Sequence, residues 1–345
     1  MAAQGSQAGA VAGTASTADT TDAPQIVEHV SMGANCTPYD VKWIPSSARF
    51  VVAGLKPRGT GCLQVYELDV GKATLSAEVG FYRWQLVRAF HHVGDYGGQM
   101  SIWCAATPRD LERTSAPVFN VQAHTSLVNA IDGVAGLGIG AGAPEIVTAG
   151  RDGCVRLWDP RVQEPQLSLE PEEGKARDCW AVAFGNAYSD DERVIAAGYD
   201  NGDVKVFDLR TSKLLWEDNV GNGVVDLQFD RKDIDMNKLL VTTLESKFRV
   251  YDMRHLPQNR DVFATTGGNG GLNLYKYTYP LSRTRKDEEG RLAGVMGSVE
   301  LLNSRILTPQ PLVGWDWSPD KEGLAAAVAL DQTVRVYIVT KLNKL

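Results

Sequence analysis

The sequence has few cysteines and histidines, and neither kind of residue is arranged as a metal site would require. It contains five of each, with no Cys-x-x-Cys pair and no histidine at ligand spacing from a cysteine. The cysteines are Cys36, Cys62, Cys104, Cys154 and Cys179. We therefore expect reduced thiols, with no disulfide framework and no bound metal.

Long apolar runs and basic runs are also missing. No stretch approaches the roughly 20 apolar residues of a membrane span. The formal net charge is −7, with acidic and basic residues interspersed, so no basic stripe is available for nucleic acid or anionic lipid. Hydrophobic residues make up 43% of the 345 residues, enough for a large core. We expect a globular protein, monomeric on its own, whose partners are proteins.

The N-terminal region lacks the features of a targeting segment. No lysine or arginine precedes Lys42, and residues 1–23 are rich in Ala, Gly, Ser and Thr without an apolar core. This composition fits neither a secretory signal nor an Arg-rich transit peptide. We expect a disordered tail over residues 1–23, a folded domain over residues 24–345, and a cytoplasmic location.

What the sequence does contain is a repeated unit, of which Val147 to Arg161 is the clearest copy. Residues 145–149 are apolar and β-prone, Asp152-Gly153 has turn chemistry, and an alternating strand then ends on Trp158-Asp159. The unit resembles a WD repeat, which is one blade of a β-propeller.

Seven segments share this turn, alternating strand and aromatic end. Their aromatic residues are Tyr66, Trp103, Trp158, Phe207, Tyr251, Tyr275 and Tyr337. Their average spacing of about 45 residues matches a four-stranded blade, and helical periodicity is absent. The sequence therefore predicts an all-β, seven-bladed WD-repeat β-propeller.

Further alternating runs predict the inner strands and the closure of the ring. The inner strands are expected at residues 41–45, 128–132, 180–184, 225–229 and 313–317. A ring of blades must avoid leaving its first and last sheets with exposed edges. We expect residues 24–30 to pair beside Val334 to Val339 as the outer strand of the last blade.

Two regions depart from the repeat. Only 24 residues separate Tyr251 from Tyr275, too few for an outer strand, an inner strand and a hairpin. About 20 residues are missing at the Met253/Arg254 junction. Residues 79–93 lack an inner strand and a clean alternating strand. The second and sixth blades are therefore expected to be truncated.

One set of polar residues falls at the spacing of the WD-repeat hydrogen-bond tetrad. It comprises His124, Thr148, Asp152 and Trp158. A His, an Asp and a hydroxyl would also fit a catalytic triad. We favour the structural interpretation, because all four residues come from one blade and satisfy buried polar groups. The glycine-rich run 136–142 precedes a proline and a strand rather than a helix, which disfavours a phosphate loop. We expect no catalytic residue and no cofactor.

Two other sets of residues are candidates for protein contacts. Trp180 is out of phase with the apolar alternation of its strand, and Tyr39 and Asn129 occupy the same slot. With the turn residues Arg151 and Asp200, they are candidate protein-binding residues. Aromatic-Asp-x-Arg ends place Arg161, Arg210 and Arg254 in a pattern that resembles the WDxR box, by which some propellers dock onto the adaptor of a cullin-RING ubiquitin ligase. Local pairing of each arginine with nearby acids is the alternative.

Several longer segments resemble one family. They are residues 128–161, 177–210, 229–254, 254–263 and 331–345. Over residues 24–345 the chain resembles the Monad-type WD-repeat dynein axonemal assembly factors. The resemblance implies a seven-bladed propeller without catalytic activity that supports cytoplasmic preassembly of dynein arms for motile cilia, with a link to apoptosis in animals. It further implies association with RuvB-like AAA+ ATPases, a TPR co-chaperone and prefoldin-like subunits, with dynein heavy chains as clients.

Overall fold

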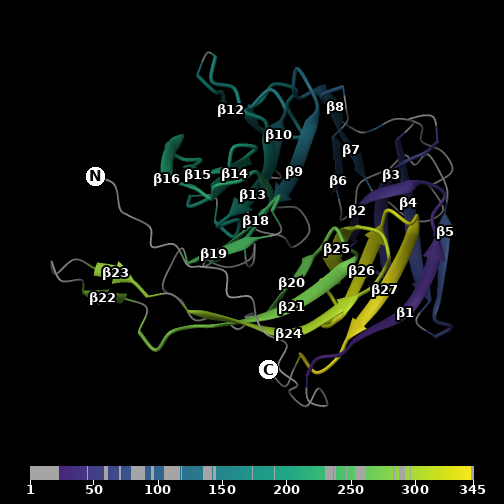
Figure 1. Ribbon diagram of the computed structural model, residues 1–345. Coiled ribbons are helices and arrows are strands. Elements are labelled where there is room, and N and C mark those ends of the chain that lie inside the picture. The colour runs from purple at the N-terminus through teal and green to yellow at the C-terminus, as the bar shows by residue number, and fades with distance from the viewer. Residues whose placement is uncertain are drawn as a thin grey trace.

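The computed structural model consists almost entirely of β-strands. It describes residues 23–44, 46–57, 61–69, 71–78, 90–94, 97–104, 117, 119–134, 142, 145–172, 174–189, 191–229, 236, 238–245, 247–252, 262–282, 284–286, 292–295 and 297–342. Within these residues the strands form small antiparallel sheets that follow one another around a ring (Figure 1). The all-β propeller predicted from the repeats is confirmed.

Four sheets have four strands each. The first contains β2 (Thr37–Trp43), β3 (Arg49–Leu55), β4 (Gly61–Asp69) and β5 (Thr74–Glu78). The second contains β9 (Val128–Val134), β10 (Glu145–Gly150), β11 (Val155–Trp158) and β12 (Leu167–Leu169). The third contains β13 (Cys179–Gly185), β14 (Val194–Tyr199), β15 (Asp203–Asp208) and β16 (Lys213–Asn219). The fourth contains β25 (Leu312–Trp317), β26 (Leu324–Ala329), β27 (Thr333–Val339) and β1 (Ile26–Gly33).

Three further sheets have three strands among the described residues. They are β6 (Phe90–Gly94), β7 (Gln99–Cys104) and β8 (Phe119–Gln122); β17 (Val224–Phe229), β18 (Lys238–Thr243) and β19 (Phe248–Asp252); and β20 (Val262–Thr266), β21 (Gly271–Thr278) and β24 (Ser298–Ile306). A two-stranded hairpin of β22 (Thr284–Lys286) and β23 (Leu292–Gly294) projects away from the ring in Figure 1.

The predicted strands are found at the predicted places. Five of the seven aromatic residues lie on the third strand of a sheet, whereas Trp103 and Tyr275 lie on the second strands of the β6–β8 and β20–β21–β24 sheets. The five predicted inner strands correspond to β2, β9, β13, β17 and β25. One expectation was wrong, because residues 90–93 do form a strand: β6 pairs with β7 although its Phe-His-His-Val sequence does not alternate. Residues 79–89 and Arg254 lie outside the described residues. The number of blades and their truncation stay predictions.

The ring is closed by pairing between the two ends of the chain. β1 runs antiparallel to β27, with Ile26 opposite Val339 and Gly33 opposite Thr333. In Figure 1 the purple β1 accordingly lies beside the yellow β27. Ile26 is 2% exposed and packs with apolar residues of the preceding sheet. The predicted closing strand is therefore confirmed, and it contributes to the core as well as covering an edge.

Neighbouring sheets are held together by apolar layers and by carboxylates. Each layer consists of residues from two adjacent sheets, such as Phe184 of β13 against Val147 of β10. In addition, the carboxylate of Asp316 on β25 accepts a hydrogen bond from the backbone N–H of Trp43 at 2.7 Å, and that of Asp132 on β9 accepts one from Phe184 at 2.9 Å. Two pairs of neighbouring inner strands, β2 with β25 and β9 with β13, are thus linked by the same kind of contact.

The inner strands share a β-bulge. In five of them the pairing register skips one residue near the start of the strand, and a bulge of this kind re-aims the skipped side chain. The skipped residues are Tyr39, Asn129, Trp180, Val225 and Val313. The slot that the sequence placed out of phase is therefore a bulge position.

Among the residues that the structure describes, none belongs to a helix with the length and apolar character that a membrane span requires.

The closing strand provides a stability test. Ile26→Ala should lower the free energy of unfolding by about 2–4 kcal/mol, because it leaves a cavity between two sheets. The control is Val27→Ala, since Val27 lies next to it on the same strand but is 46% exposed, and this variant should change the stability by less than about 0.5 kcal/mol. Urea denaturation measures both. Equal effects of the two variants would show that β1 does not contribute to the core.

Candidate functional site

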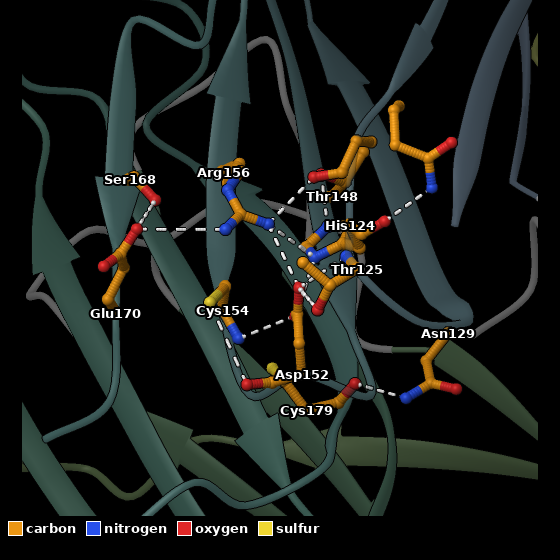
Figure 2. Close-up of polar contacts among 12 residues, drawn as sticks. His124, Thr125, Asn129, Thr148, Asp152, Cys154, Arg156, Ser168, Glu170 and Cys179 are labelled. Carbon is orange, nitrogen blue, oxygen red and sulfur yellow. Dashed lines mark hydrogen bonds and ion pairs between the residues drawn. The ribbon is translucent and has the colours of Figure 1, made fainter. Parts of the chain in front are cut away.

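The most polar buried site lies in the β9–β12 sheet, at the repeat that the sequence marks most clearly. His124 is in the connection between β8 and β9, Thr148 is on β10, Asp152 is in the turn between β10 and β11, and Trp158 ends β11. The turn is possible because Gly153 has a φ of 79°, which a residue with a side chain rarely adopts. Figure 2 shows three of these side chains, His124, Thr148 and Asp152, converging in front of β10 and β11.

The four residues are joined by one chain of hydrogen bonds. The Trp158 indole N–H donates to Thr148 Oγ1 at 2.9 Å, Thr148 Oγ1 lies 2.8 Å from His124 Nε2, and His124 Nδ1 lies 2.8 Å from Asp152 Oδ1. A neutral imidazole protonated at Nδ1 satisfies every member, because Thr148 then donates to Nε2 and Nδ1 donates to the carboxylate. We call this set the blade relay.

Burial determines what the blade relay can do. Thr148 is 0% exposed and His124 is 2% exposed, so no substrate carbonyl can approach the hydroxyl. Burial also lowers the pKa of His124, which favours the neutral ring. Burial alone would raise the pKa of Asp152, but hydrogen bonds from His124 and from the backbone N–H groups of Thr125 and Cys154 lower it to about 2. This geometry favours a structural role over nucleophilic catalysis.

An arginine completes the site, and sequence reasoning missed it. Arg156 Nη1 donates to Asp152 Oδ2 at 3.2 Å and to the carbonyl of Ala123 at 2.8 Å. The β25–β27 sheet repeats the pair: Arg335 Nη2 donates to Asp331 Oδ2 at 2.7 Å. Both pairs follow the pattern Asp-x-x-Val-Arg, and this signal could have revealed them. In the β25–β27 sheet Thr308 takes the place of the histidine, with its hydroxyl 2.7 Å from Asp331.

The three bulge residues named as candidate protein contacts differ in their surroundings. Tyr39 is 46% exposed. The Asn129 amide instead donates to the carbonyl of Cys179 at 2.9 Å, which links two neighbouring sheets. Trp180 is half-buried and its ring covers Gly223, where any side chain would clash. Tyr39 is thus the most accessible of the three.

The two turn candidates lie near Trp180. Arg151 Nε is 3.5 Å from Asp178 Oδ2, and its side chain is 63% exposed. The backbone N–H of Asp200 donates to the carbonyl of Asp178. Two exposed apolar residues beside them were not predicted: Val225, which is the bulge residue of β17, and Leu244, whose N–H donates to the carbonyl of Gly223. We call Trp180, Val225 and Leu244 the apolar rim.

Charged residues of the inner strands line the space beside the bulges. The side chains of Lys42 and Asp40 are 59% and 55% exposed, with 3.9 Å between Nζ and Oδ1. The field of Asp40, followed by those of Asp316, Asp226 and Asp132, raises the pKa of Lys42. The charges of four carboxylates on the inner strands thus act on one ammonium group.

The ligase-type arginines are held locally or lie outside the description. Arg161 donates to the carboxylate of Asp159, and this hydrogen bond lowers the pKa of Asp159. The backbone N–H of Arg210 donates to Asp208 at 2.9 Å. Arg161 and Arg210 are both exposed and follow the third strands of adjacent sheets. Arg254 lies outside the described residues.

Metal ligation has little support in the described part of the chain, where no group of three or more His, Cys, Asp or Glu side chains is placed to hold an ion.

The blade relay predicts a measurable loss on removal of one hydroxyl. Thr148→Val should destabilise the protein by about 1–3 kcal/mol, because Trp158 and His124 would each lose a buried hydrogen-bond partner. Ser168→Ala is a suitable control from the same sheet, since the Ser168 hydroxyl bonds only the exposed Glu170 in the structure. Urea unfolding of the two variants gives the comparison. A Thr148→Val protein as stable as the control would contradict a stabilising role for the relay.

Comparison with known protein families finds a match at the same repeat. The family model "WD domain, G-beta repeat" matches residues 115–159, which include the whole blade relay. Dynein axonemal assembly factor 10 of Homo sapiens is 49% identical over 357 residues, covering 93% of this chain and 98% of the relative. The protein of the same name from Chlamydomonas reinhardtii is 49% identical over 362 residues, covering 94% and 99%. That from Dictyostelium discoideum is 20% identical over 374 residues, covering 90% and 94%. The chain therefore belongs to the dynein axonemal assembly factor 10 family of WD-repeat proteins.

Proposed function

We propose that the protein is a non-enzymatic cytoplasmic scaffold for dynein arm preassembly. It links client proteins, in particular axonemal dynein heavy chains, to a co-chaperone complex of RuvB-like AAA+ ATPases, a TPR co-chaperone and prefoldin-like subunits. The name shared by relatives at 49% identity supports the role in dynein assembly. The burial of His124 and Thr148 in the blade relay supports a scaffold rather than an enzyme, because these two side chains have no access to a substrate.

The apolar rim is the observation that carries this proposal. Val225 is 48% exposed and Leu244 is 62% exposed, and both lie close to Gly223, which the half-buried Trp180 covers. Exposed apolar and aromatic side chains in such a group are the usual anchors of protein contacts. Tyr39 adds a further aromatic side chain at a bulge, and the carboxylates beside the bulges favour client segments that combine apolar and basic residues.

We also propose that the ring has seven blades, of which the second and sixth are truncated. The three-stranded sheets β6–β8 and β20–β21–β24 support this proposal, since their aromatic residues Trp103 and Tyr275 lie on the second strand, whereas the other five sheets carry theirs on the third. Aligned lengths point the same way: 357 residues are aligned with the human relative although only 93% of this 345-residue chain takes part. The relatives therefore carry residues with no counterpart here.

The scaffold proposal predicts which variant loses its client. Leu244→Asp should reduce the dynein heavy chain recovered with the tagged protein from ciliated cells about tenfold, which corresponds to the loss of one anchor residue. Leu215→Asp is the matched control, because Leu215 is 55% exposed on the outer strand β16. Quantitative mass spectrometry measures both. Recovery of heavy chain that is unchanged by Leu244→Asp would exclude the apolar rim as its binding site.

A ubiquitin-ligase substrate receptor is the second candidate function. The exposed, equivalent positions of Arg161 and Arg210 on adjacent sheets favour it. If it is correct, replacement of both arginines by alanine should abolish recovery of the ligase adaptor and leave the AAA+ ATPases unchanged. Recovery of the adaptor without AAA+ or TPR subunits from the unmodified protein would reject the scaffold proposal instead.

A further inference from the structure

Two cysteines from separate parts of the first sheet lie on the same side of it. Cys36 is in the connection between β1 and β2, and Cys62 is on β4. In the strand ladder Cys62 is directly opposite Gly54 of β3, and Gly54 is opposite Pro38 of β2. The strand β3 therefore separates the two cysteines, and its residue between them is a glycine.

Gly54 provides the space in which the two thiols meet. A Cβ atom at Gly54 would lie 2.7 Å from Cys36 Sγ and 2.6 Å from the carbonyl oxygen of Thr37. Any other residue would thus displace the Cys36 side chain from the sheet. With glycine at this position the Cys36 thiol lies over β3, on the face of the sheet that also carries the Cys62 side chain, and its Sγ reaches Gln64 Oε1 of β4 at 3.5 Å.

The surroundings differ for the two sulfur atoms. Cys36 is 2% exposed, whereas Cys62 is partly accessible. Burial, followed by the neighbouring Cys62 thiol, raises the pKa of Cys36 to about 12, while the charge of Lys56 acts in the opposite direction. Cys36 therefore stays protonated, and Cys62 is the sulfur that a dissolved oxidant meets first.

A buried amide next to Cys36 has an unused donor. Gln64 is 1% exposed, and its Oε1 accepts hydrogen bonds from Cys36 at 3.5 Å and from the Tyr66 hydroxyl at 3.1 Å. Its Nε2 has no hydrogen-bond partner among the described residues. A buried N–H without a partner is costly, so the polar groups around the Cys36 thiol are not fully satisfied in the reduced state.

We propose that Cys36 and Cys62 are a peroxide-sensitive dithiol that closes to an intramolecular disulfide. In the first step the Cys62 thiolate attacks one oxygen of the peroxide, which gives the Cys62 sulfenic acid and releases hydroxide, or an alkoxide from an organic peroxide. In the second step Cys36 sulfur attacks the Cys62 sulfur, the S–O bond breaks, and the thiol proton leaves with the hydroxyl group as water. Peroxide is reduced, and the two thiols are oxidised.

The position of Cys36 makes this closure feasible and gives it a consequence. Cys36 lies outside any strand, so a shift to bonding distance falls on a connection rather than on a ladder. The same connection carries the Ala34 N–H that donates to the carbonyl of Gln332 at 2.6 Å. A disulfide would therefore fasten the end of the ring-closing strand to the first sheet.

Cys154 is a matched control within the same protein. It precedes the aromatic residue of its third strand by four positions, as Cys62 does. At the position that Cys36 occupies beside Cys62, Cys154 has the ring of His124 instead of a thiol. The Cys154 sulfur lies 3.9 Å from the carbonyl oxygen of Asp152. Cys154 should therefore survive the treatment that oxidises Cys62.

The test uses the full-length chain treated with hydrogen peroxide, followed by alkylation of the remaining thiols and mass spectrometry. We expect a cross-linked peptide that contains Cys36 and Cys62, and a decrease of about tenfold or more in their alkylation, while Cys154 and Cys179 are alkylated as before. Dithiothreitol should restore the labelling. A closed bond should also raise the thermal midpoint of the unmodified protein relative to its reduced form.

Variants separate the two steps. In Cys36→Ser the Cys62 sulfenic acid should persist and be trapped by dimedone, whereas Cys62→Ser should give neither adduct nor cross-link. Cys154→Ser should behave as the unmodified protein. The proposal is overturned if the unmodified protein, still folded by its circular dichroism, forms no Cys36–Cys62 cross-link in peroxide, or if Cys62 is oxidised no faster than Cys154.

Discussion

The pairing of β1 with β27 is the constraint on which the rest of the ring depends. Each sheet buries both of its faces only if another sheet packs against each face. The last sheet packs against the first only when its outer strand, β1, is in place. The backbone N–H of Gln25 bonds the side chain of Thr340 across 315 residues, and the adjacent β1–β27 ladder fixes the register. The β1–β27 ladder closes the ring. The apolar layers between the sheets and the hydrogen bonds that Asp132 and Asp316 accept then stabilise the closed ring.

Stabilisation is unevenly distributed around the ring. The β9–β12 sheet has the full blade relay with Arg156, and the β25–β27 sheet has a shorter version in which Thr308 contacts Asp331. The first sheet uses Gln64 and Tyr66 instead. Each is a different way to satisfy polar groups that the packing of neighbouring sheets removes from water. Loss of a relay hydrogen bond should therefore reduce the stability of its own sheet and of the neighbouring sheet most.

The sequence predicts the strands well because buried and exposed residues alternate along a half-buried strand, as Val155, Arg156 and Leu157 illustrate. The four relay residues were placed together by spacing for the same reason. What the sequence did not predict are contacts that depend on the third dimension. Val225 is an ordinary apolar residue in the sequence, and the bulge of β17 turns it outward. Leu244 is exposed because it lies in the turn after β18, and the predicted surface residue Asn129 instead bonds the carbonyl of Cys179.

The shared bulge has a consequence for how this fold can change over evolutionary time. It gives five inner strands one residue each that is excluded from the ladder, while the residues before and after it keep the core intact. A tyrosine, an asparagine, a tryptophan and two valines now occupy these positions. A substitution at one of these positions changes the side chains at one end of the ring. It leaves the alternation of buried and exposed residues in the rest of the inner strand unchanged. The same scaffold can thus acquire a new recognition surface by a handful of independent point mutations.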